Sequence, residues 1–132
     1  MRVAIFIFAF LYFMTPVMAQ SRPDSMPVYP GCETAKEKMP CLKEKLLDFI
    51  AGNFNQDILF SIKDSSSVQM LITFIIDTDG SLTEIHINSP YDSLNTEMQR
   101  VLSKLPKIIP AKKGQTPVTM QYQLPVSFDI KK

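Results

Sequence analysis

The sequence predicts a small α+β domain in which helices cover one face of a three-stranded antiparallel sheet. Two segments carry apolar residues at helical spacing, and the C-terminal segment alternates strictly between apolar and polar residues. Between them, two β-rich segments flank an Asp-Gly turn. In chain order these signals give helix, strand, strand, helix, strand, and an alternating strand has one buried and one exposed face.

The first helix is expected to begin at Cys41 and to stop near Gly52. Five apolar residues fall on one helical face at positions i, i+4, i+7, i+8 and i+12: Leu42, Leu46, Phe49, Ile50 and Phe54. Charged residues occupy the opposite face. This pattern is typical of an amphipathic helix that packs on a sheet.

A β-hairpin is predicted over residues 68–88. Residues 68–76 are rich in β-branched and aromatic side chains, and residues 77–80 read Asp-Thr-Asp-Gly, which favours a tight turn. In the returning strand we expect Thr83, Ile85 and Ile87 on one face and Leu82, Glu84 and His86 on the other. A calcium loop is the alternative for Asp77 and Asp79, but an EF-hand needs a third oxygen ligand and a twelfth-position glutamate that this segment lacks.

The second helix is expected to begin at Asn95, a good N-cap residue, and to end before Pro106. Its apolar stripe, at spacing i, i+3, i+4 and i+7, is formed by Met98, Val101, Leu102 and Leu105. We expect this stripe to face the core.

The last segment predicts one long strand over residues 118–130. Its buried face is expected to carry Val118, Met120, Tyr122, Leu124, Val126, Phe128 and Ile130. Pro125 lies on the exposed face, and a proline inside a strand indicates a sheet edge or a bulge. A long edge strand is a docking site for another extended chain, but a proline can equally blunt such an edge. The pattern favours neither outcome.

The N-terminus predicts a secretory signal peptide over residues 1–19. Arg2 precedes an apolar run over residues 3–13, and Val17 and Ala19 are the small residues of a cleavage site before Gln20. An uncleaved anchor is the alternative interpretation. We expect residues 20–40 to form an extended arm, residues 41–132 to form the domain, and the exported protein to be periplasmic.

Export bears on the two cysteines, Cys32 and Cys41, because thiols are oxidised outside the cytosol. A structural disulfide is the favoured interpretation, with free thiols and a metal or catalytic site as alternatives. A metal site needs further ligands, and the single histidine, His86, lies far away in sequence.

Composition excludes several function classes. Without Arg2, 13 basic residues face 13 acidic residues, whereas nucleic-acid binding needs a clustered basic surface. The sequence shows no Ser/His/Asp set, metal cluster or phosphate loop. We therefore expect no enzyme activity, no cofactor, no metal and no small-molecule substrate.

Two stretches resemble the C-terminal domain of TonB-type energy transducers: "FIIDTDGSLTEIHI" and "LNTEMQRVLSKLPKIIPAKKGQTPVTMQYQLPVSFDI". The similarity rests on an acidic-x-Asp-Gly turn, a Leu-Pro-Lys helix end, a Lys-Gly turn and a closing Leu-Pro-Val-x-Phe strand, in order. The upstream "YPGCE" resembles a cysteine-containing branch of that family.

The resemblance implies a periplasmic domain whose last strand pairs with the short TonB box of an outer-membrane transporter. The implied partner-binding edge is formed by Thr119, Met120, Gln121, Tyr122, Gln123 and Leu124. The same edge would allow a homodimer. Because residues 20–39 reach only about 70 Å when fully extended, a free-standing structural or assembly module of the envelope is the alternative to a motor-coupled transducer.

Overall fold

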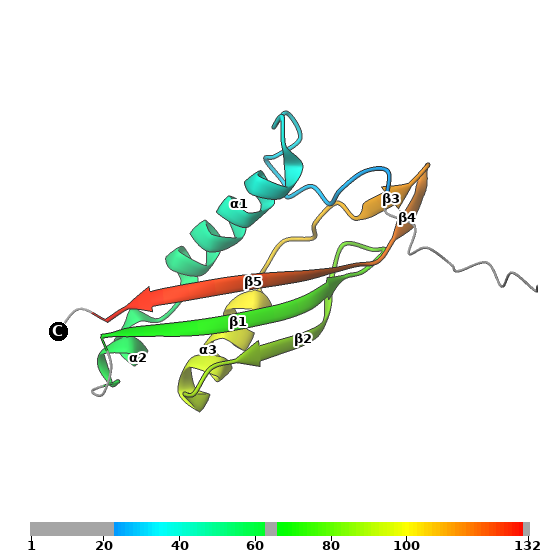
Figure 1. Cartoon of the computed structure of the whole chain (residues 1–132). Coiled ribbons are helices and arrows are strands. Elements are labelled where there is room, and N and C mark those ends of the chain that lie inside the picture. The colour runs from blue at the N-terminus through cyan, green and yellow to red at the C-terminus, as the bar shows by residue number, and fades with distance from the viewer. Residues whose placement is uncertain (1–22, 63–65, 131–132) are drawn as a thin grey trace, which may run out of the picture.

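The computed structural model describes residues 23–62 and 66–130. The predicted signal peptide lies outside the described residues. Within these two ranges, eight elements follow one another from α1 to β5; Figure 1 shows their arrangement. Within the described ranges, no helix is long and apolar enough to cross a membrane.

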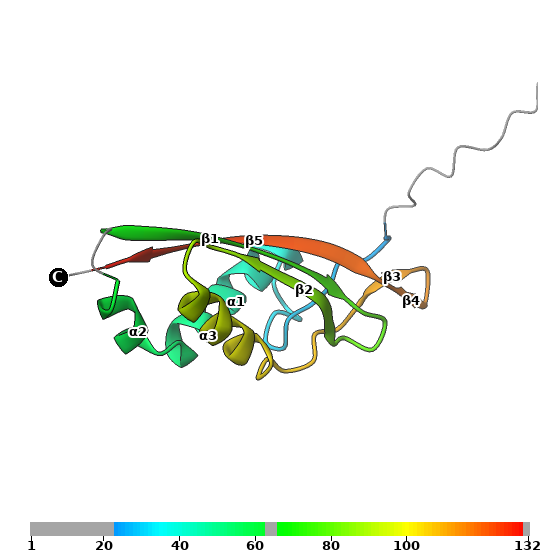
Figure 2. The same ribbon diagram turned by 90° about the horizontal axis from the view of Figure 1, so that it is seen from below.

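Three strands form the main sheet: β1 (Ser67–Ile76), β2 (Leu82–Asn88) and β5 (Met120–Asp129). Their order is β2-β1-β5 and both pairings are antiparallel. A separate two-stranded sheet joins β3 (Ala111–Lys113) to β4 (Thr116–Val118). Seen edge-on, the main sheet carries its helices on one face (Figure 2). The predicted fold class is confirmed.

The helices are α1 (Lys38–Asn53), α2 (Gln56–Phe60) and α3 (Asp92–Leu102). The core lies between them and the sheet, because alternate β1 residues are buried on that face. Its largest fully buried side chains include Phe74, Leu42, Leu46, Ile50, Met70, Ile72, Ile76, Leu94, Met98 and Leu124. The predicted apolar stripes of both helices therefore face the core, although Phe49 and Leu105 are only partly buried. Leu105 lies outside the helix, because α3 ends at Leu102 and not just before Pro106.

Both long helices begin earlier than predicted. Helix α1 starts at Lys38, with Pro40 in its first turn, where the missing N–H would have had no helical partner anyway. Helix α3 starts at Asp92 and not at Asn95. Instead of capping the helix, the Asn95 side chain accepts a hydrogen bond from Ser89 Oγ at 2.6 Å. Asn95 thus ties α3 to the segment that follows β2.

The β2 strand contains a bulge that the sequence pattern did not predict. Thr73 pairs with His86 but Ile75 pairs with Thr83, so β2 has one extra residue here. The backbone of Glu84 has a positive φ of 47°. A bulge reverses the alternation, so Leu82 packs toward the core with Ile85 and Ile87. The prediction that Leu82 lies on the face opposite these two isoleucines was therefore wrong.

The predicted long strand is divided in two. Residues 116–118 form β4 and pair with β3, whereas β5 begins at Met120 and pairs with β1. Thr119 belongs to neither strand. The apolar and polar residues continue to alternate across Thr119. This alternation shows which face of a strand is buried, but it does not show with which strand the segment pairs.

The arm before α1 is docked between Ser25 and Val28 and continues through turns from Tyr29 to the start of α1. Ser25 bridges Lys112 and Val28 bridges Ile109, each through reciprocal backbone hydrogen bonds of 2.9–3.0 Å. The Asp24 carboxylate also accepts a hydrogen bond from the backbone N–H of Gly114 at 2.6 Å. The described arm is thus held at two points against β3 and the residues that precede it.

A disulfide joins Cys32 to Cys41, as predicted, and links the end of the arm to the first turns of α1. Cys32 is fully buried. Within the same loop, the Lys38 ammonium donates to the carbonyl oxygens of Cys32, Glu33 and Ala35, at 3.2, 2.5 and 2.8 Å. The short loop is therefore closed both covalently and by a charge-assisted cluster.

Candidate functional site

The outer edge of β5 is the candidate site. One side of β5 pairs with β1 along its whole length, from Met120 to Asp129. On its other side, no segment within the described ranges forms a backbone ladder with it. Such an edge presents main-chain N–H and C=O groups to an incoming extended chain.

One hydrogen bond shows which residues point their backbone groups outward. The N–H of Ile130 donates to the carbonyl oxygen of Ser66 at 2.8 Å, so the main-chain N–H of Ile130 points toward the β1 side. Main-chain groups alternate in direction along a strand, and the β1–β5 register has no shift. Even-numbered residues of β5 therefore point their N–H toward β1, and odd-numbered residues point it toward the outer edge.

This alternation divides the predicted binding residues into two groups. The N–H and C=O groups of Gln121 and Gln123 point outward and their side chains are exposed. Met120, Tyr122 and Leu124 face β1 with their backbone groups. The side chains of Tyr122 and Leu124 pack with the core, and that of Met120 is half-buried. Thr119 precedes the strand. The outward main-chain groups of the predicted edge are thus those of two glutamines.

Pro125 lies in the outward set, opposite Leu71. Its missing N–H therefore breaks no hydrogen bond between β5 and β1, which explains why the ladder passes through it without a bulge. The same position removes one donor from the outer edge. Pro125 and Leu71 both have exposed side chains on the open face of the sheet.

The opposite edge of the sheet is less suited to strand addition. The Glu84 bulge distorts β2 and places a charged residue in the middle of that edge. Bulges and edge charges are the usual protection against strand pairing. Of the two edges of the main sheet, β5 is therefore the regular one.

Helix α1 lies under the β5 side of the sheet and reaches past the strand's outer edge in the face-on view (Figures 1 and 2). The rings of Phe74 and Tyr122 pack with centroids 5.6 Å apart on this side of the sheet. Burial raises the pKa of the Tyr122 phenol. Because α1 extends beyond this edge, a strand added beside β5 would place its inward-facing side chains over α1.

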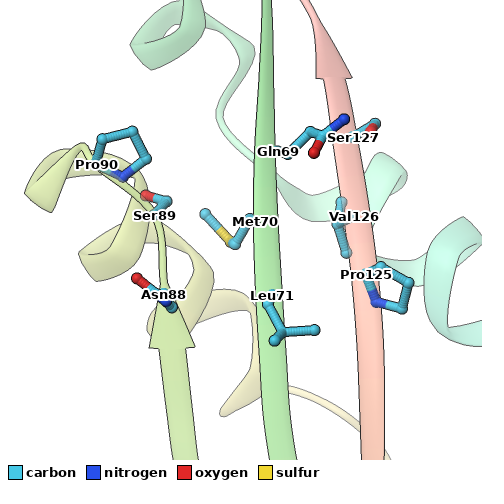
Figure 3. A pocket seen from close by; sticks show the side chains of 9 residues that line it. All are labelled: Gln69, Met70, Leu71, Asn88, Ser89, Pro90, Pro125, Val126 and Ser127. Carbon is cyan, nitrogen blue, oxygen red and sulfur yellow. The ribbon is translucent and has the colours of Figure 1, made fainter.

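A shallow groove of about 560 Å³ opens on the sheet beside Pro125. It spans the three strands where β2 ends, and its walls are Gln69, Met70, Leu71, Asn88, Ser89, Pro90, Pro125, Val126 and Ser127 (Figure 3). Pro90 and Pro125 stand on opposite sides of it. The groove is continuous with the candidate edge at Pro125.

A polar cluster around the buried carboxylate of Glu97 supports the scaffold and was not predicted from the sequence. The Glu97 carboxylate is 8% exposed and accepts hydrogen bonds from Arg100 and from the backbone N–H of Asn55. Arg100 also donates to the carbonyl oxygen of Asn53 at 2.9 Å. These contacts lower the pKa of Glu97, with the Arg100 hydrogen bond as the largest cause. The i, i+3 spacing of Glu97 and Arg100 was the only sequence signal.

The comparisons agree with this geometry. The family model described as Gram-negative bacterial TonB protein C-terminal matches residues 65–130, half of the 132-residue chain. The matched region contains all three strands of the main sheet and helix α3. The chain therefore belongs to the TonB C-terminal domain family. No curated protein matched the sequence.

Proposed function

We propose that this protein is a periplasmic TonB-like domain that binds an extended peptide segment of an outer-membrane transporter, of the TonB-box type, in transport across the outer membrane. The segment adds as a fourth strand to the outer edge of β5. The protein acts as a binding module and not as an enzyme. The family assignment supports the location and the class of partner.

The observation that carries this proposal is the regular outer edge of β5 at Gln121 and Gln123. Each of these residues can exchange two main-chain hydrogen bonds with an incoming antiparallel strand. A net value of about 0.5–1.5 kcal/mol per hydrogen bond gives four such bonds roughly 2–6 kcal/mol. Binding of this strength is reversible, as a contact that must form and release requires.

The experiment is a titration of the exported full chain with peptides from the periplasmic N-termini of transporters. Isothermal calorimetry measures affinity, and amide chemical shifts identify the residues contacted. We expect the largest shifts at Gln121 and Gln123. Gln121→Pro removes an outward N–H and should weaken binding about tenfold, whereas Gln121→Val retains the N–H and serves as the matched control.

Circular dichroism of both variants checks that the sheet is intact. Absence of binding to any transporter peptide, or equal binding by the Gln121→Pro and Gln121→Val variants, would contradict the proposal.

A second candidate is a structural or assembly module of the envelope that pairs through the same edge. The edge is self-complementary: in an antiparallel pairing centred on Tyr122, Gln121 of one copy faces Gln123 of the other. Light scattering at increasing protein concentration distinguishes the two. A homodimer that Gln121→Pro dissociates would favour the assembly role, and a monomer at all concentrations would exclude this route.

A further inference from the structure

We propose that Pro125 terminates the added strand, so that the binding site accepts a short run paired with Gln121 and Gln123 and is closed to chain pairing beyond it. This inference rests on the proposed function. It assigns to Pro125 the position of a specificity-determining residue that fixes how much of the partner can be engaged.

The first argument is the pattern of outward donors. Along the outer edge of β5, Gln121, Gln123, Ser127 and Asp129 present N–H groups, and Pro125 interrupts this series near the middle of the strand. An added antiparallel strand that crossed Pro125 would leave one of its own carbonyl oxygens without a donor. A carbonyl that loses water without gaining a partner opposes binding.

The second argument is steric. The proline ring carbon replaces the amide hydrogen and so points outward, toward the space that a neighbouring strand would occupy. Strands in a ladder lie about 4.8 Å apart, and this spacing assumes a hydrogen at that place. Pro125 therefore both removes a bond and obstructs approach, whereas at Gln121 and Gln123 neither obstacle exists.

The third argument is that the missing N–H of Pro125 affects only an added strand and leaves the pairing between β5 and β1 intact. The register between β1 and β5 continues through the Leu71–Pro125 pair without a shift. The side chain of Pro125 is exposed beside the groove of Figure 3, where it packs into no core. Replacing Pro125 should therefore leave the fold intact and change only what the outer edge can accept.

The test uses two acetylated and amidated peptides of alternating threonine and valine, one of five residues and one of nine. Main-chain pairing depends little on side-chain identity, so these probes report on strand length. We expect the full chain to bind both peptides with the same affinity within about twofold. The Pro125→Thr variant should bind the nine-residue peptide about fivefold more tightly and the five-residue peptide unchanged.

Hydrogen exchange supplies a readout that does not depend on affinity. In the wild type, either peptide should protect the amides of Gln121 and Gln123 and leave Ser127 and Asp129 unchanged. In Pro125→Thr, the nine-residue peptide should also protect Ser127 and Asp129. The variant Ser127→Thr adds the same side chain at the next outward position and retains its donor, so it should behave as the wild type.

The outcomes separate the two proposals. If both peptides bind but the longer one already gains affinity and protects Ser127 in the wild type, the inference about Pro125 is wrong and strand addition stands. A Pro125→Thr variant that binds the nine-residue peptide no more tightly than the wild type does would also overturn the inference about Pro125. If neither peptide binds and the transporter peptides also fail, strand addition itself is overturned, and the inference with it.

Discussion

Gly80 lies directly against the backbone of Ile108. A Cβ atom built on Gly80 would lie 2.0 Å from the carbonyl oxygen of Ile108, and Gly80 has a φ of +85°. The two residues are also joined by a hydrogen bond of 2.9 Å, from the Ile108 N–H to the Gly80 carbonyl oxygen. The β1–β2 turn and the segment leading to β3 thus meet through main chain alone, which only glycine permits at this position.

The variant Gly80→Ala should therefore be strongly destabilised, by about 3 kcal/mol or more in urea unfolding, because the clash and the unfavourable φ add. Gly114→Ala is the matched control. Gly114 also has a positive φ, of 64°, but a Cβ atom added there would meet nothing within 4 Å. Its cost should be only about 1 kcal/mol. Equal losses in the two variants would show that the contact with Ile108 is unimportant.

Glu84 in the β2 bulge should be replaceable with a gain in stability. Its φ of 47° is in the left-handed region, which costs most residues about 1–2 kcal/mol and asparagine less. We expect Glu84→Asn to raise the free energy of unfolding by about 0.5 kcal/mol and Glu84→Val to lower it by about 1 kcal/mol. The reverse order in urea unfolding would mean that β2 does not keep this bulge in solution.

Glu97 should make stability depend on acid pH. Its native pKa is lowered, chiefly by the Arg100 hydrogen bonds, so the ionised carboxylate favours the folded state. This contribution is complete above the ordinary glutamate pKa of about 4.3 and is lost as the pH falls through the lower native value. Glu97→Gln should lower the unfolding free energy by about 1–2 kcal/mol at pH 7.

Urea unfolding between pH 7 and pH 3 checks this prediction. The difference between the wild type and Glu97→Gln should shrink at the acid end. A difference that stays constant over the whole range would exclude the Glu97–Arg100 pair as its source.

The disulfide should contribute about 2–3 kcal/mol, since it closes a loop with a sequence separation of 9. The double variant Cys32→Ala/Cys41→Ala tests this in urea. The reduced wild type provides the control, because it loses the bond but retains the side chains. We expect both to unfold at lower urea concentration than the oxidised protein, and an unchanged midpoint would contradict a stabilising role.

The alternation of backbone direction along β5 can be tested by two neighbouring proline substitutions. Gln123→Pro removes an outward N–H and should cost less than about 1 kcal/mol. Tyr122→Pro removes an N–H that faces β1, as well as a half-buried ring, and should cost about 3 kcal/mol or more. The variant Tyr122→Ala, which loses the ring but retains the N–H, measures the part of this loss that is due to the ring. Thermal unfolding in which Gln123→Pro is the more damaging change would reverse the assigned directions.

The sequence predicted those parts of the fold that depend on local pattern. The stripe from Leu42 to Ile50 and the alternation along β5 both report burial, and burial follows directly from the periodicity of apolar residues. The same local patterns predicted the order of helices and strands along the chain, whereas the order of the strands in the sheet was not predicted. The Cys32–Cys41 bond followed from compartment and proximity in sequence.

The features that were missed depend on long-range partners. The bulge at Glu84 changes no residue type, so the pattern of β2 looked regular although its register shifts. Pairing of Val118 with β3 and of Met120 with β1 cannot be read from one strand. At the candidate edge, the outward direction of the Pro125 main chain depends on how β5 pairs with β1, which the Ile130–Ser66 hydrogen bond fixes.

The docked arm also determines how the domain would respond to tension. A pull on the chain before Asp24 would first load the carboxylate contact with Gly114 and then the backbone pairs at Ser25 and Val28. The loop from Cys32 to Cys41 would not extend, because the disulfide transfers the load directly to α1. The arm thus has an outer attachment held by hydrogen bonds alone and an inner attachment held by a covalent bond.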